Sequence, residues 1–279
     1  LGRAVNMSKQ LLSNVVTTFQ EVAKMDGKSP SLLEVSAEPI KQNSGWATEL
    51  VEMISKLTKK LIESSKKYGI ENLLIMVDDE GNLSSSDPNQ IIESVEKHKR
   101  WIEMAYELGC HSVRVNLEGE EDLEKWKVNS VNGLTHLSDF ASKSNINIIV
   151  ENHGSHSSNG KALAQVIKNV NMENCGTLPD FGNFCMKRKN NSLYDGPCEL
   201  EYDKYQGMRD LMPFAKAVSA KSYDFDNKGE ETTIDFKRIM NIIKEFKYEG
   251  FLGIEYEGNI LSEIEGIELT KKLIQKYNY

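Results

Sequence analysis

The chain has 279 residues, of which 39% are hydrophobic and 27% charged, and its formal net charge at pH 7 is −8. This acidic balance argues against a protein that binds nucleic acid phosphates, which requires a basic surface. No run of 18 apolar residues is present, so we expect no membrane-spanning helix. The length suits one large domain, and α/β barrels commonly have this size.

The four cysteines, Cys110, Cys175, Cys185 and Cys198, are spread along the chain without a CxxC spacing. This pattern favours buried free thiols in a reducing compartment over a zinc ribbon or a disulfide scaffold. We therefore favour a cytoplasmic location. The chain begins with Leu1 rather than Met, which leaves a removed signal peptide open.

Strand-like and helix-like segments alternate along the sequence. Short apolar runs predict strands at residues 32–37, 72–78, 112–117, 147–152, 175–180, 217–224 and 251–256. Amphipathic segments predict helices at 47–68, 90–108, 129–142, 160–170, 235–246 and 264–277. A further helix is expected at 8–24, preceded only by the weak strand candidate 1–7.

This alternation predicts a parallel sheet covered by helices. We expect an α/β fold of the (β/α)8 TIM-barrel type, forming a single domain over residues 1–279. Its first strand is expected to be short or missing, because residues 1–7 are a poor strand sequence. An open doubly wound sheet is the alternative, but no GxGxxG motif or P-loop follows a predicted strand.

Acidic side chains stand where three predicted strands end. Glu151 ends NIIVE, Asp180 ends CGTLPD, and Glu255 lies near the end of FLGIEY. The carboxyl ends of barrel strands meet at one mouth, where three carboxylates repel each other unless a cation is present. Each acid taken singly is more simply a solvated loop residue. Three together favour a hard divalent cation bound by carboxylate oxygens.

The segments NIIVENHG, CGTLPDFGNF, AVSAKSYDFD and GFLGIEYEG, with LGCHSVRVN upstream, resemble the xylose-isomerase-like TIM-barrel superfamily of sugar (phosphate) isomerases and epimerases. The resemblance spans residues 32–277. It implies a mononuclear site for a divalent metal such as Mn, Mg, Co or Zn, with Glu151, Asp180 and Glu255 as ligands. It also implies that Glu151 and Glu255 are the catalytic acid and base, and that the metal stabilises an enediolate.

One position departs from the family pattern. The family usually carries a histidine on the seventh strand, where this chain has Lys221. The metal would then be held by three carboxylates and water, with Lys221 binding substrate. Alternatively, Lys221 has a lowered pKa and acts as a catalytic base, or its ammonium replaces the metal altogether.

Five further polar residues near the strand ends are candidates for substrate binding: Arg114, Asn116, His153, Asn183 and Glu257. Arg114 and Asn116 are two residues apart on one predicted strand and so share a face, as do Glu255 and Glu257. Simpler interpretations remain open, namely an internal ion pair for Arg114, a loop cap for His153 and a turn for Asn183.

The resemblance implies a sugar (phosphate) isomerase or epimerase that removes a proton next to a carbonyl, with a small carbohydrate as its partner. A lyase acting on keto-sugars or 3-keto-glycosides through the same enolate chemistry is an alternative. A non-catalytic sugar-binding barrel is a second alternative. We expect no nucleic acid or membrane partner, and a homo-oligomer is compatible with the family.

Overall fold

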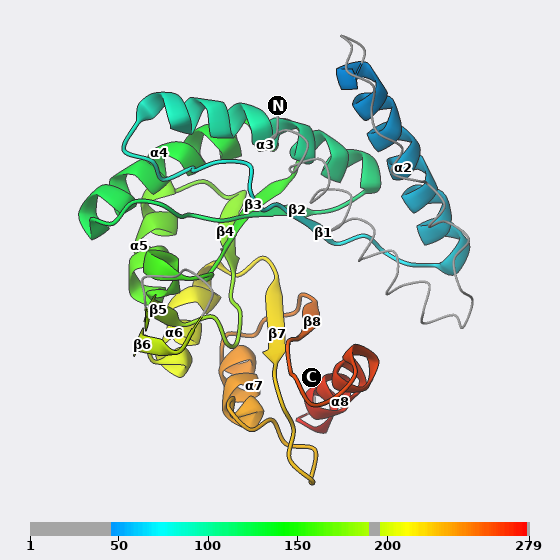
Figure 1. The fold of residues 1–279 in the computed structure, drawn as a ribbon, viewed down its shortest axis with the longest axis vertical. Coiled ribbons are helices and arrows are strands. Elements are labelled where there is room, and N and C mark those ends of the chain that lie inside the picture. Colours follow the sequence, from blue (N-terminus) through cyan, green and yellow to red (C-terminus); the bar gives the residue numbers. More distant parts are fainter. Residues whose placement is uncertain (1–45, 190–195, 278–279) are drawn as a thin grey trace. The chain divides into compact units, whose positions relative to one another are not determined.

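The computed structural model describes residues 46–189 and 196–277 (Figure 1). Its contacts divide the chain into two units, residues 1–60 and 61–279. The strands predicted at 1–7 and 32–37 and the helix predicted at 8–24 lie outside the described residues, so the single-domain organisation stays a prediction. Helix α2 (Trp46–Tyr68) begins one residue before its predicted start.

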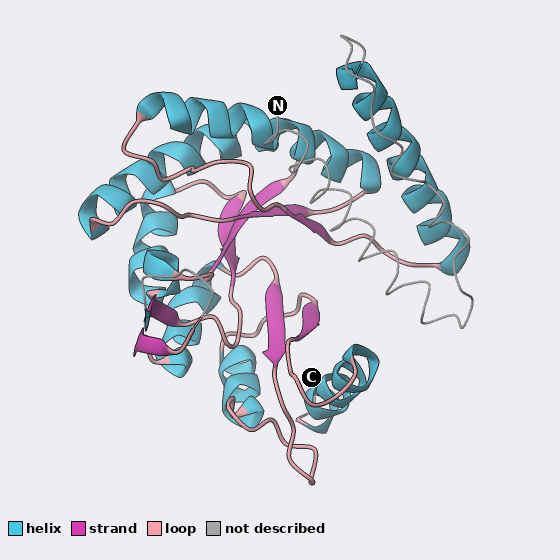
Figure 2. Ribbon diagram, viewed as in Figure 1, coloured by secondary structure: helices cyan, strands magenta, loops and turns pink. Residues whose placement is uncertain are grey.

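The second unit contains six parallel strands, drawn with the helices around them in Figure 2, and two further strands lie between the fourth and fifth of them in the chain. The strands are β1 (Leu74–Met76), β2 (Ser112–Val115), β3 (Asn147–Glu151), β4 (Cys175–Leu178), β7 (Val218–Ser222) and β8 (Leu252–Tyr256). The first four form one sheet and the last two form a pair. Parallel bridges from Thr177 to Ala215 and from Asp180 to Ser219 connect the β4 and β7 regions. This order matches the barrel prediction.

A helix follows each of these strands, and consecutive helices pack against each other. After α2 the helices are α3 (Pro88–Leu108), α4 (Leu123–Ser142), α5 (Gly160–Val170), α6 (Lys204–Leu211), α7 (Phe236–Glu245) and α8 (Glu263–Lys276). All six begin at an Asp, Asn or Ser whose side chain accepts a backbone N–H of the first turn. Two short 3₁₀ helices, η2 (Ser155–Ser158) and η4 (Met212–Phe214), lie between them.

The central strands carry the core of the sheet. All four residues of β2, and all of β3 except Asn147, are buried, as expected for parallel strands covered by helices. Helix α5 has the predicted bounds, whereas α4 begins six residues before its predicted start because Asp122 caps it. Among the described helices, none combines the length and apolar character needed to cross a bilayer.

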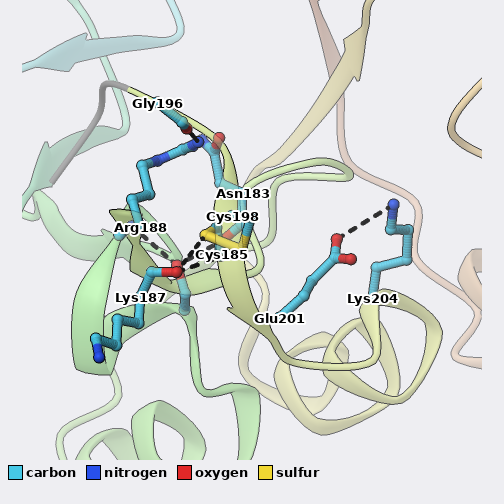
Figure 3. The surroundings of a disulfide bond; sticks show 10 residues. Asn183, Cys185, Lys187, Arg188, Gly196, Cys198, Glu201 and Lys204 are labelled. Atoms are coloured by element: carbon cyan, nitrogen blue, oxygen red, sulfur yellow. Dashed lines mark hydrogen bonds and ion pairs between the residues drawn. A yellow bond between two sulfur atoms is a disulfide. The ribbon is translucent and has the colours of Figure 1, made fainter. Parts of the chain in front are cut away.

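The sequence did not predict an antiparallel hairpin of β5 (Cys185–Arg188) and β6 (Cys198–Glu201). A disulfide between Cys185 and Cys198 closes this hairpin (Figure 3). The prediction of free thiols is therefore wrong for this pair and confirmed for Cys110 and Cys175, which are buried and free. Because disulfides persist mainly in oxidising compartments, the pair weighs against the expected cytoplasmic location.

Candidate active site

The three acids predicted to meet at the strand ends lie together in the structure. Glu151 is the last residue of β3, Asp180 follows β4 by two residues, and Glu255 is in β8. One carboxylate oxygen from each lies within 4.8 Å of the others. Glu151 and Asp180 lie at the carboxyl ends of β3 and β4 in the four-stranded sheet. Glu255 lies near the carboxyl end of β8 in the β7–β8 pair, and the bridge from Asp180 to Ser219 joins this pair to the β4 region.

The two carboxylate oxygens of Asp180 differ, because one caps a turn and the other accepts no hydrogen bond from the described residues. Its Oδ1 accepts the backbone N–H groups of Gly182 at 2.8 Å and Asn183 at 2.9 Å, so it caps the turn after β4. Its Oδ2 is buried and accepts no hydrogen bond from any residue in the described ranges. Burial raises the pKa of Asp180. Lys221 opposes this effect, while the charges of Glu151 and Glu255 add to it.

Asn152 fixes the relative position of the β3 and β4 ends. Its Oδ1 accepts the backbone N–H of Asp180 at 2.7 Å. Its Nδ2 donates to the carbonyls of Asp180 at 3.0 Å and Asn183 at 3.1 Å. Both side-chain groups of this buried amide are therefore engaged, and they hold the backbone of Asp180 beside the end of β3.

Glu151 is held by an amide and a guanidinium. Its Oε1 accepts a hydrogen bond from Asn183 Nδ2 at 3.0 Å. Its Oε2 lies 3.1 Å from Arg114 Nε in an ion pair, although the N–H direction does not make this contact a hydrogen bond. Burial raises the pKa of Glu151, Arg114 opposes that effect, and the charge of Glu255 adds to it.

Arg114 is occupied by protein groups. Besides Glu151, it contacts Asp78 Oδ1 at 2.5 Å and donates to the carbonyl of Val77 at 3.3 Å. The same Asp78 oxygen accepts Asn116 Nδ2 at 2.7 Å. The structure thus contains the internal ion pair that was the simpler interpretation of Arg114. Substrate contacts by Arg114 and Asn116 stay predictions.

Lys221 is buried among acids at the end of β7. Its Nζ lies 3.4 Å from Glu255 Oε1 and 3.1 Å from Glu257 Oε2, and it donates to Asn183 Oδ1 at 3.2 Å. Burial lowers the pKa of Lys221, but the charges of Asp180, Glu255 and Glu257 outweigh it, so the pKa ends above its ordinary value. The amine is therefore protonated in the metal-free protein.

The three-carboxylate group fits a hard divalent cation. Glu151 Oε2 and Asp180 Oδ2 are buried carboxylate oxygens without a hydrogen-bond donor among the residues described. Within the same ranges, Lys221 forms ion pairs only with Glu255 and Glu257. Its ammonium therefore does not pair with Asp180 or Glu151. Carboxylate oxygens of this kind are the ligands that Mg2+ and Mn2+ prefer.

A pocket of about 580 Å³ opens next to these acids. Its lining residues are His153, Gly154, Ser158, Asn183, Cys185, Arg188, Lys221, Tyr223 and Glu257. The pocket is thus lined by four of the predicted site residues, His153, Asn183, Lys221 and Glu257, and not by Arg114 or Asn116. Burial lowers the pKa of His153, and the charges of Arg114 and Lys221 add to this effect.

Two elements of the pocket were missed by the sequence analysis. Tyr223 follows Lys221 by two residues, and strand alternation places both on one face, so this signal was present in the predicted strand 217–224. Cys185 and Arg188 belong to the unpredicted hairpin, where Arg188 Nη1 donates to the carbonyl of Gly196 at 2.9 Å (Figure 3). No local pattern marked that hairpin.

The profile of the family described as xylose isomerase-like TIM barrel matches residues 33–275, and the chain belongs to this family. Similar solved structures include a D-tagatose 3-epimerase-like protein, with a TM-score of 0.61 and 20% identity over 80% of this chain and 84% of that one. A 3-keto-D-glucoside 4-epimerase from E. coli has a TM-score of 0.58 and 14% identity over 80% and 86%. The IOLI protein, whose structure has a bound zinc atom, has a TM-score of 0.60 and 19% identity over 79% and 82%.

A shorter match connects the chain with a C-glycoside deglycosidase alpha subunit from Arthrobacter globiformis. The two are 39% identical over 66 residues, which is 23% of this chain. The matched part spans 19% of the length of that relative.

Proposed function

We propose that this protein is a sugar isomerase or epimerase that removes a proton next to a carbonyl of its substrate with the help of one divalent metal ion. The observation that carries the proposal is the group of Glu151, Asp180 and Glu255, with carboxylate oxygens within 4.8 Å of each other beside a pocket. Membership of a family with sugar epimerases among its structural relatives supports a carbohydrate substrate.

In this proposal Glu151, Asp180 and Glu255 hold the metal. When bound, the ion would supply positive charge that polarises the substrate carbonyl and stabilises the enediolate. Asp180 serves only as a ligand, because Asn152 and the turn after β4 fix its position. Glu151 and Glu255 come from β3 and β8, which belong to different sheets, and are the two candidates for proton transfer.

Epimerisation requires one carboxylate to take the proton from carbon and another acid to return a proton to the opposite face. Glu151 and Glu255 are suited to these roles. Each carries a carboxylate that can take up or give back a proton. Lys221, protonated and held by Glu255 and Glu257, acts as a hydrogen-bond donor to a substrate oxygen rather than as a base.

A lyase acting on keto-glycosides is a second candidate. The match to a C-glycoside deglycosidase subunit favours it, as does the lysine at the position where the family usually has histidine. The first step would be the same proton abstraction. The electron pair left on carbon would then expel a leaving group from the neighbouring carbon, and a protonated side chain would supply the proton that the leaving group needs.

Elemental analysis of the purified chain tests the metal site. We expect about one Mn, Mg, Co or Zn per chain in the wild type and none in Glu151→Gln or Asp180→Asn. Glu124→Gln is the matched control, because this acid is exposed at the start of α4 and should not affect metal content. Absence of metal even after incubation with Mn2+ would refute the proposed site.

Incorporation of deuterium from deuterated water into the substrate, followed by NMR, tests whether a proton is removed next to the carbonyl. An epimerase should exchange and invert one carbon of a ketohexose such as D-tagatose, whereas a lyase should release the aglycone of a 3-keto-glycoside. If the protein holds metal but catalyses neither reaction, the proposed activity is overturned and sugar binding without catalysis is the remaining function.

A further inference from the structure

Tyr223 lies at the end of β7 and lines the same pocket as Lys221. We infer that its hydroxyl donates a hydrogen bond to the substrate oxygen that becomes negatively charged when the proton is removed. The inference rests on the proposed function and adds a catalytic residue to that site. Three observations support it: the backbone of the tyrosine is fixed, its hydroxyl lies next to Lys221, and that hydroxyl lacks a hydrogen-bond partner among the described residues.

The main chain of Tyr223 is fixed by a buried acid. Its backbone N–H donates to Glu231 Oε1 at 3.2 Å. The other oxygen of Glu231 accepts the backbone N–H groups of Thr233 at 2.6 Å and of Ile234. Glu231 is 8% exposed and therefore ties the start of the β7–α7 loop to its end. The tyrosine is thus presented by a rigid turn rather than by a mobile loop.

The hydroxyl of Tyr223 lies against the turn that follows β4. Gly182 is part of the turn that Asp180 caps. A Cβ on Gly182 would lie 2.8 Å from Tyr223 Oη and 3.2 Å from Lys221 Cδ. Both side chains therefore lie against the bare backbone of Gly182. This places the hydroxyl beside the Lys221 stem and against the turn that Asp180 caps.

The hydroxyl of Tyr223 has no hydrogen-bond partner within residues 46–189 and 196–277. The other hydroxyl in the pocket wall belongs to Ser158, and it already donates to the carbonyl of Asn183 at 2.8 Å. A half-buried phenol usually finds a partner, so this donor is available to a ligand. Burial raises the pKa of Tyr223 to about 12, and the proton therefore stays on the oxygen at neutral pH.

A fixed neutral donor next to a developing oxyanion stabilises the transition state more than the ground state. Other polar contacts in the pocket, such as those of Lys221 and Asn183, already involve protein groups. A substrate oxygen that replaces water at Tyr223 would gain a bond without breaking one inside the protein. No covalent bond or proton transfer to Tyr223 is required.

Tyr223→Phe tests the inference in the metal-loaded full chain, because it removes the hydroxyl and keeps the ring. We expect kcat in the exchange assay to fall about tenfold or more, with KM changed by less than about twofold. Tyr106→Phe, a change at an exposed tyrosine on α3, should leave both constants unchanged. Equal melting temperature and metal content in all three proteins would show that the loss is not structural.

Calorimetric binding of a four-carbon aldonohydroxamate, whose planar oxygens mimic an enediolate, separates this inference from the proposed function. We expect Tyr223→Phe to weaken binding about tenfold or more. If the wild type binds the hydroxamate, Tyr223→Phe weakens that binding and no keto-sugar is turned over, the proposed activity is overturned while Tyr223 remains a donor to an enediolate-like oxygen. Turnover or binding that is unchanged in Tyr223→Phe would overturn only the role of Tyr223. Neither binding nor turnover in the wild type would overturn both.

Discussion

The Lys221→Met variant would measure how much the ammonium of Lys221 contributes to the free energy of unfolding. Methionine has a side chain of similar length and fills the space of the lysine stem, so the change removes the charge with little loss of packing. The ammonium of Lys221 lies 3.4 Å from Glu255 Oε1 and 3.1 Å from Glu257 Oε2, and its side chain is 2% exposed. Its removal leaves both carboxylates without their cation.

Removing one member of a buried ion pair costs about 3–5 kcal/mol, because the other charge stays buried without compensation. Here Glu255 and Glu257 are 35% and 49% exposed. Water therefore replaces part of the lost interaction, and we expect the lower end, about 3 kcal/mol. In a domain of this size each kcal/mol lowers Tm by about 2–4 °C. The metal-free variant should melt about 6–12 °C below the wild type.

Thermal unfolding followed by circular dichroism, in EDTA and then in excess Mn2+, measures the effect. The metal should raise the Tm of Lys221→Met more than that of the wild type, because a divalent ion restores positive charge beside Glu255. Lys187→Met is the matched control, since Lys187 forms an exposed pair with Glu199 at 3.6 Å and should change Tm little. A Lys221→Met variant that melts within about 2 °C of the wild type in EDTA would refute the reasoning.

Three further predictions concern the pH dependence of stability, the packing of α6 and the disulfide. In the metal-free protein the pKa of Asp180 is raised on folding. Above the ordinary pKa of an aspartate, the folded state therefore binds more protons than the unfolded state. The free energy of unfolding, measured in urea, should fall as pH rises from about 5 to 8. A flat profile would contradict this. Gly207→Ala places a Cβ 2.1 Å from the buried ring of Phe184 and should destabilise the fold by about 1–3 kcal/mol in urea titrations, and a neutral result would show that α6 shifts freely. Cys198→Ser opens the hairpin and should cost about 2–4 kcal/mol, matched by dithiothreitol treatment of the wild type; equal stability would mean that Cys185 is not bonded in solution.

The sequence predicted the strands that form the sheet because parallel strands covered on both faces appear as short apolar runs. The run at 147–152 corresponds to β3 (Asn147–Glu151), which is buried after its first residue. The same reasoning placed Glu151, Asp180 and Glu255 at one edge, since that edge follows from strand direction alone. Side-chain detail was not needed to bring these acids together.

The hairpin was not predictable by the same signals. Strand β6 (Cys198–Glu201) is exposed along its whole length, so no apolar run marks it. The disulfide joins cysteines 13 residues apart, a spacing that corresponds to no motif. Pairing of β5 (Cys185–Arg188) with β6 brings the Cα atoms of Cys185 and Cys198 to 5.8 Å from each other, and only the tertiary structure determines this distance.

The partners of the basic residues were also decided by tertiary contacts. From the sequence, Arg114 was equally suited to a substrate contact or to an ion pair. In the structure its guanidinium forms ion pairs with Asp78 at 2.5 Å and with Glu151 at 3.1 Å. Burial makes this pairing necessary, because a guanidinium that is only 6% exposed is costly without carboxylate partners.

Asp180 is the remaining carboxylate of the group, and in the part of the chain that the structure describes it forms no ion pair. Arg114 and Lys221 each form ion pairs with two other acids, and Lys221 acts on Asp180 only through its charge, which opposes the rise in the pKa of Asp180. Asn152 and the turn after β4 nevertheless hold this buried carboxylate in place. A fixed, buried and unpaired acid is unfavourable in the metal-free protein and becomes favourable when a cation binds. The lysine at the usual histidine position is therefore compatible with a metal, because among the described residues its ammonium forms ion pairs with Glu255 and Glu257 and none with Glu151 or Asp180.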